Sequence, residues 1–491
     1  MLRMAIVAFM LASLSHAAAW YVDSARGDDA KAGNAPAAAW RTLARVASTD
    51  FQPGDRILLR SGSVFREPLR PRSSGSPEAP IVIDRYGDGA LPRVDAGNIA
   101  EDAVLLRNLQ HIEVRHLEVT NRGAAAGTRR GVHIVLDNFG TGSHIVISGL
   151  YIHDVNGTNQ QKDNGGIIFR TNGDRVPSRF DGLTIERNII RAVDRSAIAA
   201  QSFHWRRTHW FPSLRVVIRD NYVEDVGGDG IVPWATDGVR VEHNIVRHAN
   251  RRAVSDNAGI WPWSADNSVF EWNEAAFTHT TRDGQGFDSD YNSRGTLFQY
   301  NYSHDNEGGF LLICSPGRRN QAENIGNTGT VARRNISHND RSRIFHISAV
   351  ENTLVEENAI YVGLGYDVQM VLMSDWSGWA RDTRFVRNRF FVEGVARYGH
   401  GTGKNPDGTY PLAAGWGEAA GTILEGNLFF GNHVPMPADG ERQTAARVPP
   451  APRKWNSPEF DAAHPESFDA FLTAHRAWMR QLMESEFGPL P

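Results

Sequence analysis

Several features that often stabilise or localise a protein are scarce in this sequence. Cys314 is the only cysteine, so no disulfide can form within the chain. Packing and backbone hydrogen bonds must therefore hold the fold together. Lysine occurs only four times and the formal net charge is −4, which indicates neither nucleic acid nor an anionic membrane as a partner. Beyond residue 19, no stretch approaches the roughly 18 consecutive apolar residues that a membrane span requires. We expect a monomer without a membrane span.

The first residues have the pattern of a secretory signal. The segment MLRMAIVAFMLASLSHAAAW contains one arginine, an apolar stretch from Ala5 to Leu14 and a small-residue A-x-A at Ala17 to Ala19. This combination is typical of a cleaved signal peptide, here over residues 1–19. The sequence therefore predicts a periplasmic or secreted protein.

A short phrase recurs nine times between Leu183 and Asn427, as in LTIERNII, VVIRDNYV and TILEGNLF. Each copy alternates apolar and polar residues, which suits a strand, and then has an asparagine. Asparagine tolerates the left-handed conformation of a tight turn, and a column of asparagines can hydrogen-bond from coil to coil. Recurrence at this spacing predicts a solenoid of short strands, a parallel β-helix. The nine residues are Asn188, Asn221, Asn244, Asn273, Asn301, Asn335, Asn358, Asn388 and Asn427.

These repeats resemble the pectate-lyase-like superfamily of right-handed parallel β-helix proteins, over roughly residues 20–430. The early segments YVDSARGDDAKAGNAPAAAWRTLARV, FQPGDRILLRSGSVFREPL and SGSPEAPIVIDRYG are similar to the start of many secreted carbohydrate-active members. The resemblance implies an all-β right-handed solenoid that acts on a polysaccharide or oligosaccharide. The fold alone does not define an activity.

An open stack of coils exposes strand edges, so both ends are expected to be covered. Near the start, Trp40, Leu43 and Val46 fall on one face of a short helix that suits the first coil. The β-helix with this segment is predicted over 20–433, and a Pro-rich linker with a docked C-terminal helix over 434–491. That helix carries an apolar stripe, which consists of Phe468, Phe471, Leu472, Trp478 and Leu482.

A second set of apolar runs alternates with the asparagine phrases, as in AGIWPWS, QGFDSDY and GGFLLIC. Alternate residues of a strand face opposite sides. Aligning the runs on their first large apolar residue therefore predicts one column of side chains that points into the core. The residues at the alternate positions form columns that point outward. The predicted core column is Ile167, Ile198, Ile231, Ile260, Phe287, Phe310, Ile344 and Val368. The predicted outward columns are Ile168, Ala199, Val232, Trp261, Asp288, Leu311, Phe345 and Gln369, then Arg170, Gln201, Trp234, Trp263, Asp290, Ile313, Ile347 and Val371.

This alignment places Asp288 and Asp290 on an outward face, although aspartate is disfavoured in strands. Trp261 and Trp263 are expected one coil away, about 4.8 Å along the axis. Flat aromatic rings stack on sugars, and carboxylates bind hydroxyls or transfer protons. Residues two apart in a strand are roughly 6.6 Å apart, near the roughly 6.5–9.5 Å carboxyl separation of inverting glycosidases. A like-charged pair also raises one pKa and leaves an acid beside a base. The sequence predicts this pair as catalytic, and a neighbouring acid, either Asp283 in the same loop or Asp229, Asp305 or Glu307, can replace one member.

Other polar residues surround the predicted pair. Asp229 begins the run two coils earlier, and HDNEGG brings Asp305 and Glu307 to the next coil, with His304 placed to orient a carboxylate. Aspartate and glycine also form loop turns, which is the alternative explanation for Asp229 and Asp305. The predicted substrate-binding set is Trp261, Trp263, Trp234, Asp229, His304, Asp305 and Glu307.

Calcium binding is the chemical alternative for the aspartates, because calcium prefers oxygen ligands. The spacing matches no EF-hand loop, since no third acid follows at the next alternate position. We therefore expect no cofactor and keep calcium as the alternative.

Two other classes of function compete with a hydrolase. A lyase would need a cation and a lysine or arginine base, and Lys162, Arg170, Arg341 and Arg343 supply positive charge near the strands. The lyase signatures vWiDH and RxPxxR are absent, and the GHG at His400 lacks the residues that accompany it in polygalacturonases. A non-catalytic glycan-binding β-helix is the third class. The sequence favours hydrolysis of a poly- or oligosaccharide over β-elimination, and β-elimination over binding alone.

Overall fold

A computed structural model describes residues 17–490, except Asn98, Thr281, 317–321, Ser377, Lys404, 406–409, 440–443, 446–455 and Ala463. The apolar stretch of the predicted signal peptide and much of the predicted linker lie outside the described residues. Among the described residues, strands dominate and every pairing between named strands is parallel. No helix in this part of the chain is long and apolar enough to cross a membrane.

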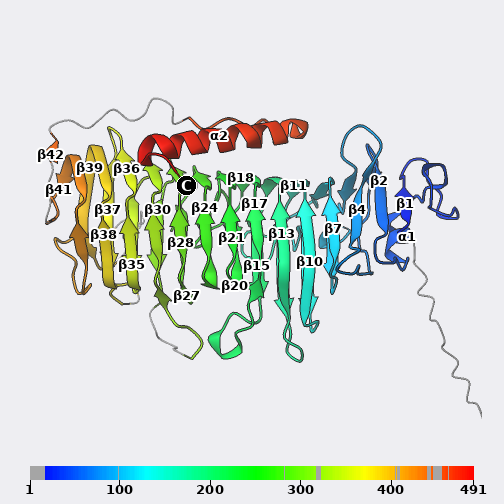
Figure 1. The fold of residues 1–491 in the computed structure, drawn as a ribbon, viewed down its shortest axis with the longest axis horizontal. Coiled ribbons are helices and arrows are strands. Elements are labelled where there is room, and N and C mark those ends of the chain that lie inside the picture. The colour runs from blue at the N-terminus through cyan, green and yellow to red at the C-terminus, as the bar shows by residue number, and fades with distance from the viewer. Residues whose placement is uncertain are drawn as a thin grey trace, which may run out of the picture.

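The strands lie side by side along the long axis of the molecule (Figure 1). In the described residues they form three parallel ladders, to each of which successive coils add strands. The first ladder contains β1 (Ala19–Val22), β2 (Arg56–Arg60), β4 (Ile81–Tyr86), β7 (Ile112–Arg115), β10 (Thr141–Ser148), β13 (Arg179–Glu186), β16 (Ser213–Leu214), β17 (Val217–Arg219), β20 (Trp234–Asp237), β21 (Arg240–Glu242), β23 (Trp263–Asp266), β24 (Val269–Glu271), β27 (Ser293–Arg294), β28 (Leu297–Gln299), β31 (Asn327–Thr328), β32 (Val331–Arg333), β35 (Glu351–Glu356), β38 (Arg381–Val386) and β40 (Ile423–Glu425).

The other two ladders join at one long strand, β39, which pairs with β36 through its first half and with β37 through its second. The second ladder contains β3 (Val64–Phe65), β5 (Arg93–Asp95), β8 (Glu118–Asn121), β11 (Tyr151–Val155), β14 (Ile189–Val193), β18 (Tyr222–Val226), β22 (Ile245–Arg247), β25 (Glu274–Ala276), β29 (Tyr302–His304), β33 (Ile336–His338), β36 (Ala359–Val362), β39 (Arg389–Gly401), β41 (Leu428–Val434) and β42 (Thr444–Ala445). The third ladder contains β6 (Asp102–Arg107), β9 (Arg130–Asp137), β12 (Gly165–Asn172), β15 (Ser196–Ser202), β19 (Ile231–Val232), β26 (Gln285–Ser289), β30 (Gly309–Cys314), β34 (Arg343–Ser348) and β37 (Asp367–Ser374).

The predicted core column is confirmed as far as Phe287 and wrong beyond it. Residues from Ile167 to Phe287 pair in the expected register. Phe287 then pairs with Leu311, and the column continues through Phe345 and Val371. The predicted Phe310, Ile344 and Val368 are also buried, but they lie beside this column.

The actual pairing is one residue out of step with the predicted alignment. The offset between β26 and β30 is constant from Gln285 and Gly309 to Ser289 and Ile313, so Leu311 and not Phe310 pairs with Phe287. Phe310 also enters the core and packs against Phe287, with ring centroids 6.1 Å apart. Leu311 then occupies the paired position, so two successive residues are in the core. A one-residue shift moves every later side chain to the other face. Leu312 and Cys314 therefore face outward in place of the predicted Leu311 and Ile313.

The nine asparagines form the predicted ladder of hydrogen bonds. All are fully buried, and the side-chain oxygen of each later asparagine accepts from the backbone N–H and Nδ2 of the preceding one. The predicted conformation is wrong, however, because the left-handed residue is the one before each asparagine, with φ of 58° at Asp220 and 59° at Trp272. Asparagine suits this position because its side-chain amide gives hydrogen-bond partners to buried backbone N–H and C=O groups of the turn.

Replacing Asn301 with alanine is expected to lower the free energy of unfolding by about 2 kcal/mol or more, because buried groups lose their partners. Its Oδ1 accepts two bonds from Asn273 at 3.0 Å, and its Nδ2 donates to the carbonyl of Phe270 at 2.9 Å. Urea denaturation measures the loss. Gln481→Ala, on an exposed helix surface, is the control and should change the value by less than about 0.5 kcal/mol. Equal stability of the two variants would contradict the role of the ladder.

The helices of the described residues are few, and all but η2 lie toward the two ends of the sequence. They are η1 (Pro36–Ala38), α1 (Leu43–Ala47), η2 (Arg207–His209), η3 (Pro465–Ser467) and α2 (Phe468–Phe487). Trp40, Leu43 and Val46 are buried, as predicted, although Trp40 precedes the helix. Helix α2 lies along the top of the stack (Figure 1) and packs against the second ladder. Its predicted stripe is buried except for the half-buried Trp478.

A buried charge cluster joins α2 to the ladder. Glu274 is fully buried, and its Oε1 accepts from Nε of Arg247 at 2.7 Å. Its Oε2 lies 2.8 Å from Nε2 of His475 on α2, and Nε2 of His304 lies 3.5 Å from Oε1. Burial raises the pKa of Glu274, but the charge of Arg247 and the two histidines outweigh burial and hold that pKa well below its ordinary value.

Candidate active site

Three carboxyl groups meet at one place on the third ladder. Asp288 on β26 and Asp290 just beyond it project from alternate positions of the same segment, as predicted. Asp288 is only 5% exposed, whereas Asp290 and the loop residue Asp283 are partly exposed. We call these three residues the acidic site. Two of its carboxyls can meet a ligand, while the third lies beneath them.

The acidic site favours protonated carboxyls. Burial, with the charges of Asp290 and Asp283, raises the pKa of Asp288 well above its ordinary value. Burial also raises the pKa of Asp290, to about 7, although the Tyr291 N–H and Cys314 thiol donate to it. At neutral pH the site therefore contains carboxylic acid and carboxylate together, as general acid–base catalysis requires.

Cys314 lies at the acidic site, whereas the predicted alignment puts Ile313 opposite Asp290. Its Sγ lies 3.3 Å from Oδ1 of Asp290 and 4.0 Å from Oδ1 of Asp288. Burial raises the pKa of this thiol well above its ordinary value, so the group remains an S–H donor. Cys314 thus lies between the two strand carboxyls.

Aromatic rings cluster on the neighbouring coils. Trp234 and Trp263 stack with centroids 4.1 Å apart, and Trp205 lies 5.6 Å from Trp263. The ring of Tyr291 meets Trp263 edge-on at 5.1 Å. Trp234 and Trp263 are partly exposed, as a sugar-binding surface requires. Trp261 projects outward as predicted, but the expected exposure is wrong, because it is only 5% exposed.

Neighbouring charges cover Trp261. Its Nε1 donates to Oδ1 of Asp229 at 3.0 Å, and the ammonium of Lys162 lies 4.5 Å from its ring centroid. Asp229 is fully buried and also pairs with Arg195 at 3.0 Å and with Lys162 at 3.3 Å. The charge of Lys162 lowers the pKa of Asp288 and of Asp290, against the larger effect of burial. These charged residues therefore hold Trp261 in place beside the acidic site.

The remaining predicted residues lie in two places. Glu307 accepts from the backbone N–H of Thr280 at 2.9 Å, and the hydroxyl of Thr280 donates to the carbonyl of Asp283 at 2.9 Å, so Glu307 adjoins the acidic loop. His304 is on the second ladder beneath α2, and its ring contacts Glu274 and Asp305. The structure does not bring His304 and Asp305 to the acidic site.

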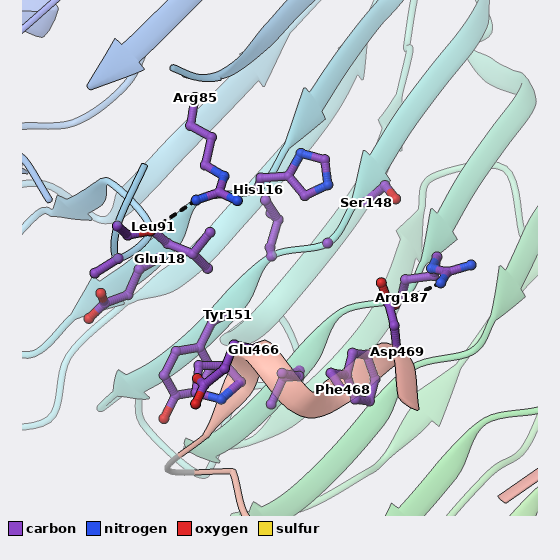
Figure 2. Close-up of a pocket in the computed structure, with 16 residues that line it drawn as sticks. Arg85, Leu91, His116, Glu118, Ser148, Tyr151, Arg187, Glu466, Phe468 and Asp469 are labelled. Atoms are coloured by element: carbon purple, nitrogen blue, oxygen red, sulfur yellow. Dashed lines mark hydrogen bonds and ion pairs between the residues drawn. The ribbon is translucent and has the colours of Figure 1, made fainter. Parts of the chain in front are cut away.

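A cavity of 590 Å³ lies elsewhere, between the start of α2 and the turns of earlier coils (Figure 2). Tyr151 and Phe468 contribute aromatic surface, while Arg187 pairs with Asp469 at 2.7 Å. None of its lining residues belongs to β26 or to the tryptophan cluster. This cavity is separate from the acidic site.

One group in the described residues has the composition of a metal site. Asp288, Asp290 and Cys314 each offer a ligand atom, and these atoms lie within 4.8 Å of one another. Calcium prefers oxygen ligands, whereas a thiolate suits a softer ion such as zinc. The residues present therefore do not fit the calcium alternative well.

The fold and this site define a parallel β-helix protein that carries a cluster of mutually close carboxyls on one strand face. No protein-family model matches the chain. A lacto-N-biosidase of Bifidobacterium longum subsp. longum is 31% identical over 443 residues, which cover 70% of this chain and 27% of that protein. The chain thus spans about a quarter of the length of this curated relative.

Two solved structures are also similar. The native GH136 lacto-N-biosidase of Eubacterium ramulus is 27% identical, with a TM-score of 0.66, over 76% of this chain and 68% of that one. Its selenomethionine derivative is 25% identical, with a TM-score of 0.63, over 84% and 67%.

Proposed function

We propose that this protein is a glycoside hydrolase that cleaves an oligosaccharide or polysaccharide. The observation that carries the proposal is the acidic site, where partly exposed Asp290 has a pKa raised to about 7 by burial beside two further carboxyls. An acid with a pKa near the working pH donates a proton efficiently to a leaving oxygen. The similarity to lacto-N-biosidases supports the same reaction class.

We assign Asp290 as the general acid. The second carboxyl is Asp283 or Asp288, and their exposure favours Asp283, because a group that contacts substrate must reach the surface. Asp288 is buried beneath, and its own pKa is raised by burial and by the charges of Asp290 and Asp283. Trp263 and Trp234 supply the sugar-stacking surface, and Glu307 supports the acidic loop.

A lyase has less support. Lys162, its best candidate base, already pairs with Asp229 and covers Trp261. Arg170 pairs with Asp163 at 2.9 Å. Elimination needs a base that is free to remove a proton from substrate.

The wider organisation is part of the same proposal. Residues 20–433 belong to one right-handed solenoid that Trp40, Leu43 and Val46 cap, and the chain after it leads to the docked helix α2. The protein is exported after removal of residues 1–19, acts as a monomer and needs no metal ion.

A substrate screen tests the reaction class. The purified protein is incubated with neutral oligosaccharides, including ones that contain lacto-N-biose, and with uronate polysaccharides. Hydrolysis yields new reducing ends without absorbance from an unsaturated product. Unsaturated products would contradict the proposal, as would binding without cleavage. Loss of activity after chelation would contradict the metal-free mechanism.

Trp263→Ala is expected to raise KM about tenfold with little change in kcat, because the loss of roughly 1.4 kcal/mol of stacking is one decade in binding. Initial rates across a substrate series measure both constants. Trp272→Ala is the matched control, since Trp272 stacks on Tyr300 and packs toward α2. An unchanged KM in Trp263→Ala would remove this residue from the binding surface.

A further inference from the structure

Arg343 is a buried cation that reaches the acidic loop. It begins β34 and is 1% exposed. Its Nη2 donates to the carbonyl of Arg282 at 2.8 Å and to that of Asp283 at 3.0 Å. Burial lowers the pKa of Arg343, and the charge of Asp283 opposes this shift, so the Asp283 carboxylate lies near the guanidinium.

A pair of glycines lets three successive coils approach one another closely beside Arg343. The backbone N–H of Gly308 donates to the carbonyl of Gly284 at 2.9 Å, and that of Arg343 donates to the carbonyl of Gly308 at 3.3 Å. A Cβ at Gly308 would lie 1.9 Å from the carbonyl oxygen of Asp283. A Cβ at Gly309 would lie 1.7 Å from the carbonyl oxygen of Arg343. Only glycine allows the three coils to approach this closely.

We propose that Arg343 is a positioning residue, which fixes the Arg282–Gly284 loop from within the stack so that the Asp283 carboxylate faces Asp290. This inference rests on the proposed hydrolase function. Two carbonyl contacts on adjacent residues restrain the loop backbone on either side of the Asp283 Cα. The positive charge also favours the ionised form of the carboxylate that must act as base or nucleophile.

The cost of burying Arg343 argues against a purely packing role. Taking a charged group out of water is costly unless it is paired, and an apolar side chain would fill the same space at lower cost. The neighbouring Arg341 is different, because its guanidinium lies 5.5 Å over the ring of Tyr366 and contacts solvent. Arg341 is therefore the matched control.

The experiment compares Arg343→Ala, Arg343→Lys and Arg341→Ala in the full-length protein. Misplacement of a reacting group by about 1 Å can cost up to about 100-fold in rate, so we expect Arg343→Ala to lower kcat by roughly 10- to 100-fold with little change in KM. Loss of the cation makes ionisation of the nearby carboxylate harder, so the acid limb of the pH–rate profile should move to higher pH. Added guanidinium, far below unfolding concentrations, should restore part of kcat. Arg343→Lys should retain more kcat than Arg343→Ala, and Arg341→Ala should match the wild type.

Hydrogen–deuterium exchange of the loop gives a readout that needs no substrate. Arg343→Ala should exchange faster than the wild type at the amides of Asp283 and Gly284, while the Asn301 amide remains protected. Unchanged loop exchange overturns the inference. An activity loss with an unshifted pH profile and no guanidinium rescue also overturns it, because that result reports folding alone. If the wild type cleaves no glycan, the proposed function fails, and the exchange experiment alone decides whether Arg343 anchors the loop.

Discussion

Asp290→Asn is expected to lower kcat by about 100-fold or more, because the amide keeps the size of the carboxyl but cannot transfer its proton. The wild-type rate should fall as pH rises through about 7, since burial raises the pKa of Asp290 to that value and the reaction needs its protonated form. Initial rates of reducing-end release across pH 4 to about 9 measure both effects. The alkaline limb should be absent from the residual activity of the variant.

Asp283→Asn and Asp288→Asn complete this experiment. Asp283→Asn should lose activity on the same scale if Asp283 is the base or nucleophile, whereas Asp288→Asn should shift the pH profile with a smaller loss. The opposite order would make Asp288 the second catalytic carboxyl. Wild-type turnover in all three variants would show that the acidic site is not catalytic.

The same substitutions are expected to affect stability in the opposite direction to activity. The folded-state pKa values of Asp288 and Asp290 are raised above the unfolded ones. Their contribution to stability is therefore fully present below the unfolded pKa, near 3.8, and is lost as pH rises through the folded values. Above pH 7, each asparagine variant should be at least as stable as the wild type.

Glu274→Ala is expected to lower the free energy of unfolding by about 3–5 kcal/mol, because it leaves the buried Arg247 with only the exposed Glu459, at 3.4 Å, as a carboxylate partner. His475 on α2 loses the same partner, so the helix should detach before the strands unfold. Denaturation monitored by circular dichroism measures the loss, and limited proteolysis detects the released helix. Glu425→Ala breaks the exposed pair with Arg384 and should change stability by less than about 1 kcal/mol.

The pH dependence of α2 docking follows from the same cluster. The low pKa of Glu274 contributes stability above its unfolded value of about 4.5, which is lost as pH falls through the folded value. His304 has a pKa raised to about 9 because hydrogen bonds to Asp305 and Glu274 outweigh burial. Its contribution is full below about 6.5 and is lost as pH rises through about 9. Glu274→Ala should remove the acid dependence and weaken the alkaline one, because Asp305 still hydrogen-bonds to His304. An unchanged acid dependence would show that other groups hold the helix.

The sequence by itself determined the repeat, the asparagine ladder and the core column from Ile167 to Phe287. These features depend on periodic side chains, and a strand period of two with a recurrent turn residue can be recognised without tertiary contacts. The outward placement of Asp288 and Asp290 followed from the same period. The apolar face of α2 followed from the helical period in the same way.

Only the tertiary structure decided the composition of the site. The pairing of Leu311 with Phe287 brings Cys314 to Asp290, and no local pattern distinguishes Phe310 from Leu311 as the paired residue. Cross-coil pairing also buries Trp261 beside Asp229, 32 residues away. Arg343 reaches Asp283 across 60 residues, at a place where two glycines let the coils approach closely. Such contacts depend on where successive coils stack, because the height and register of each coil depend on loops whose sequences carry no period.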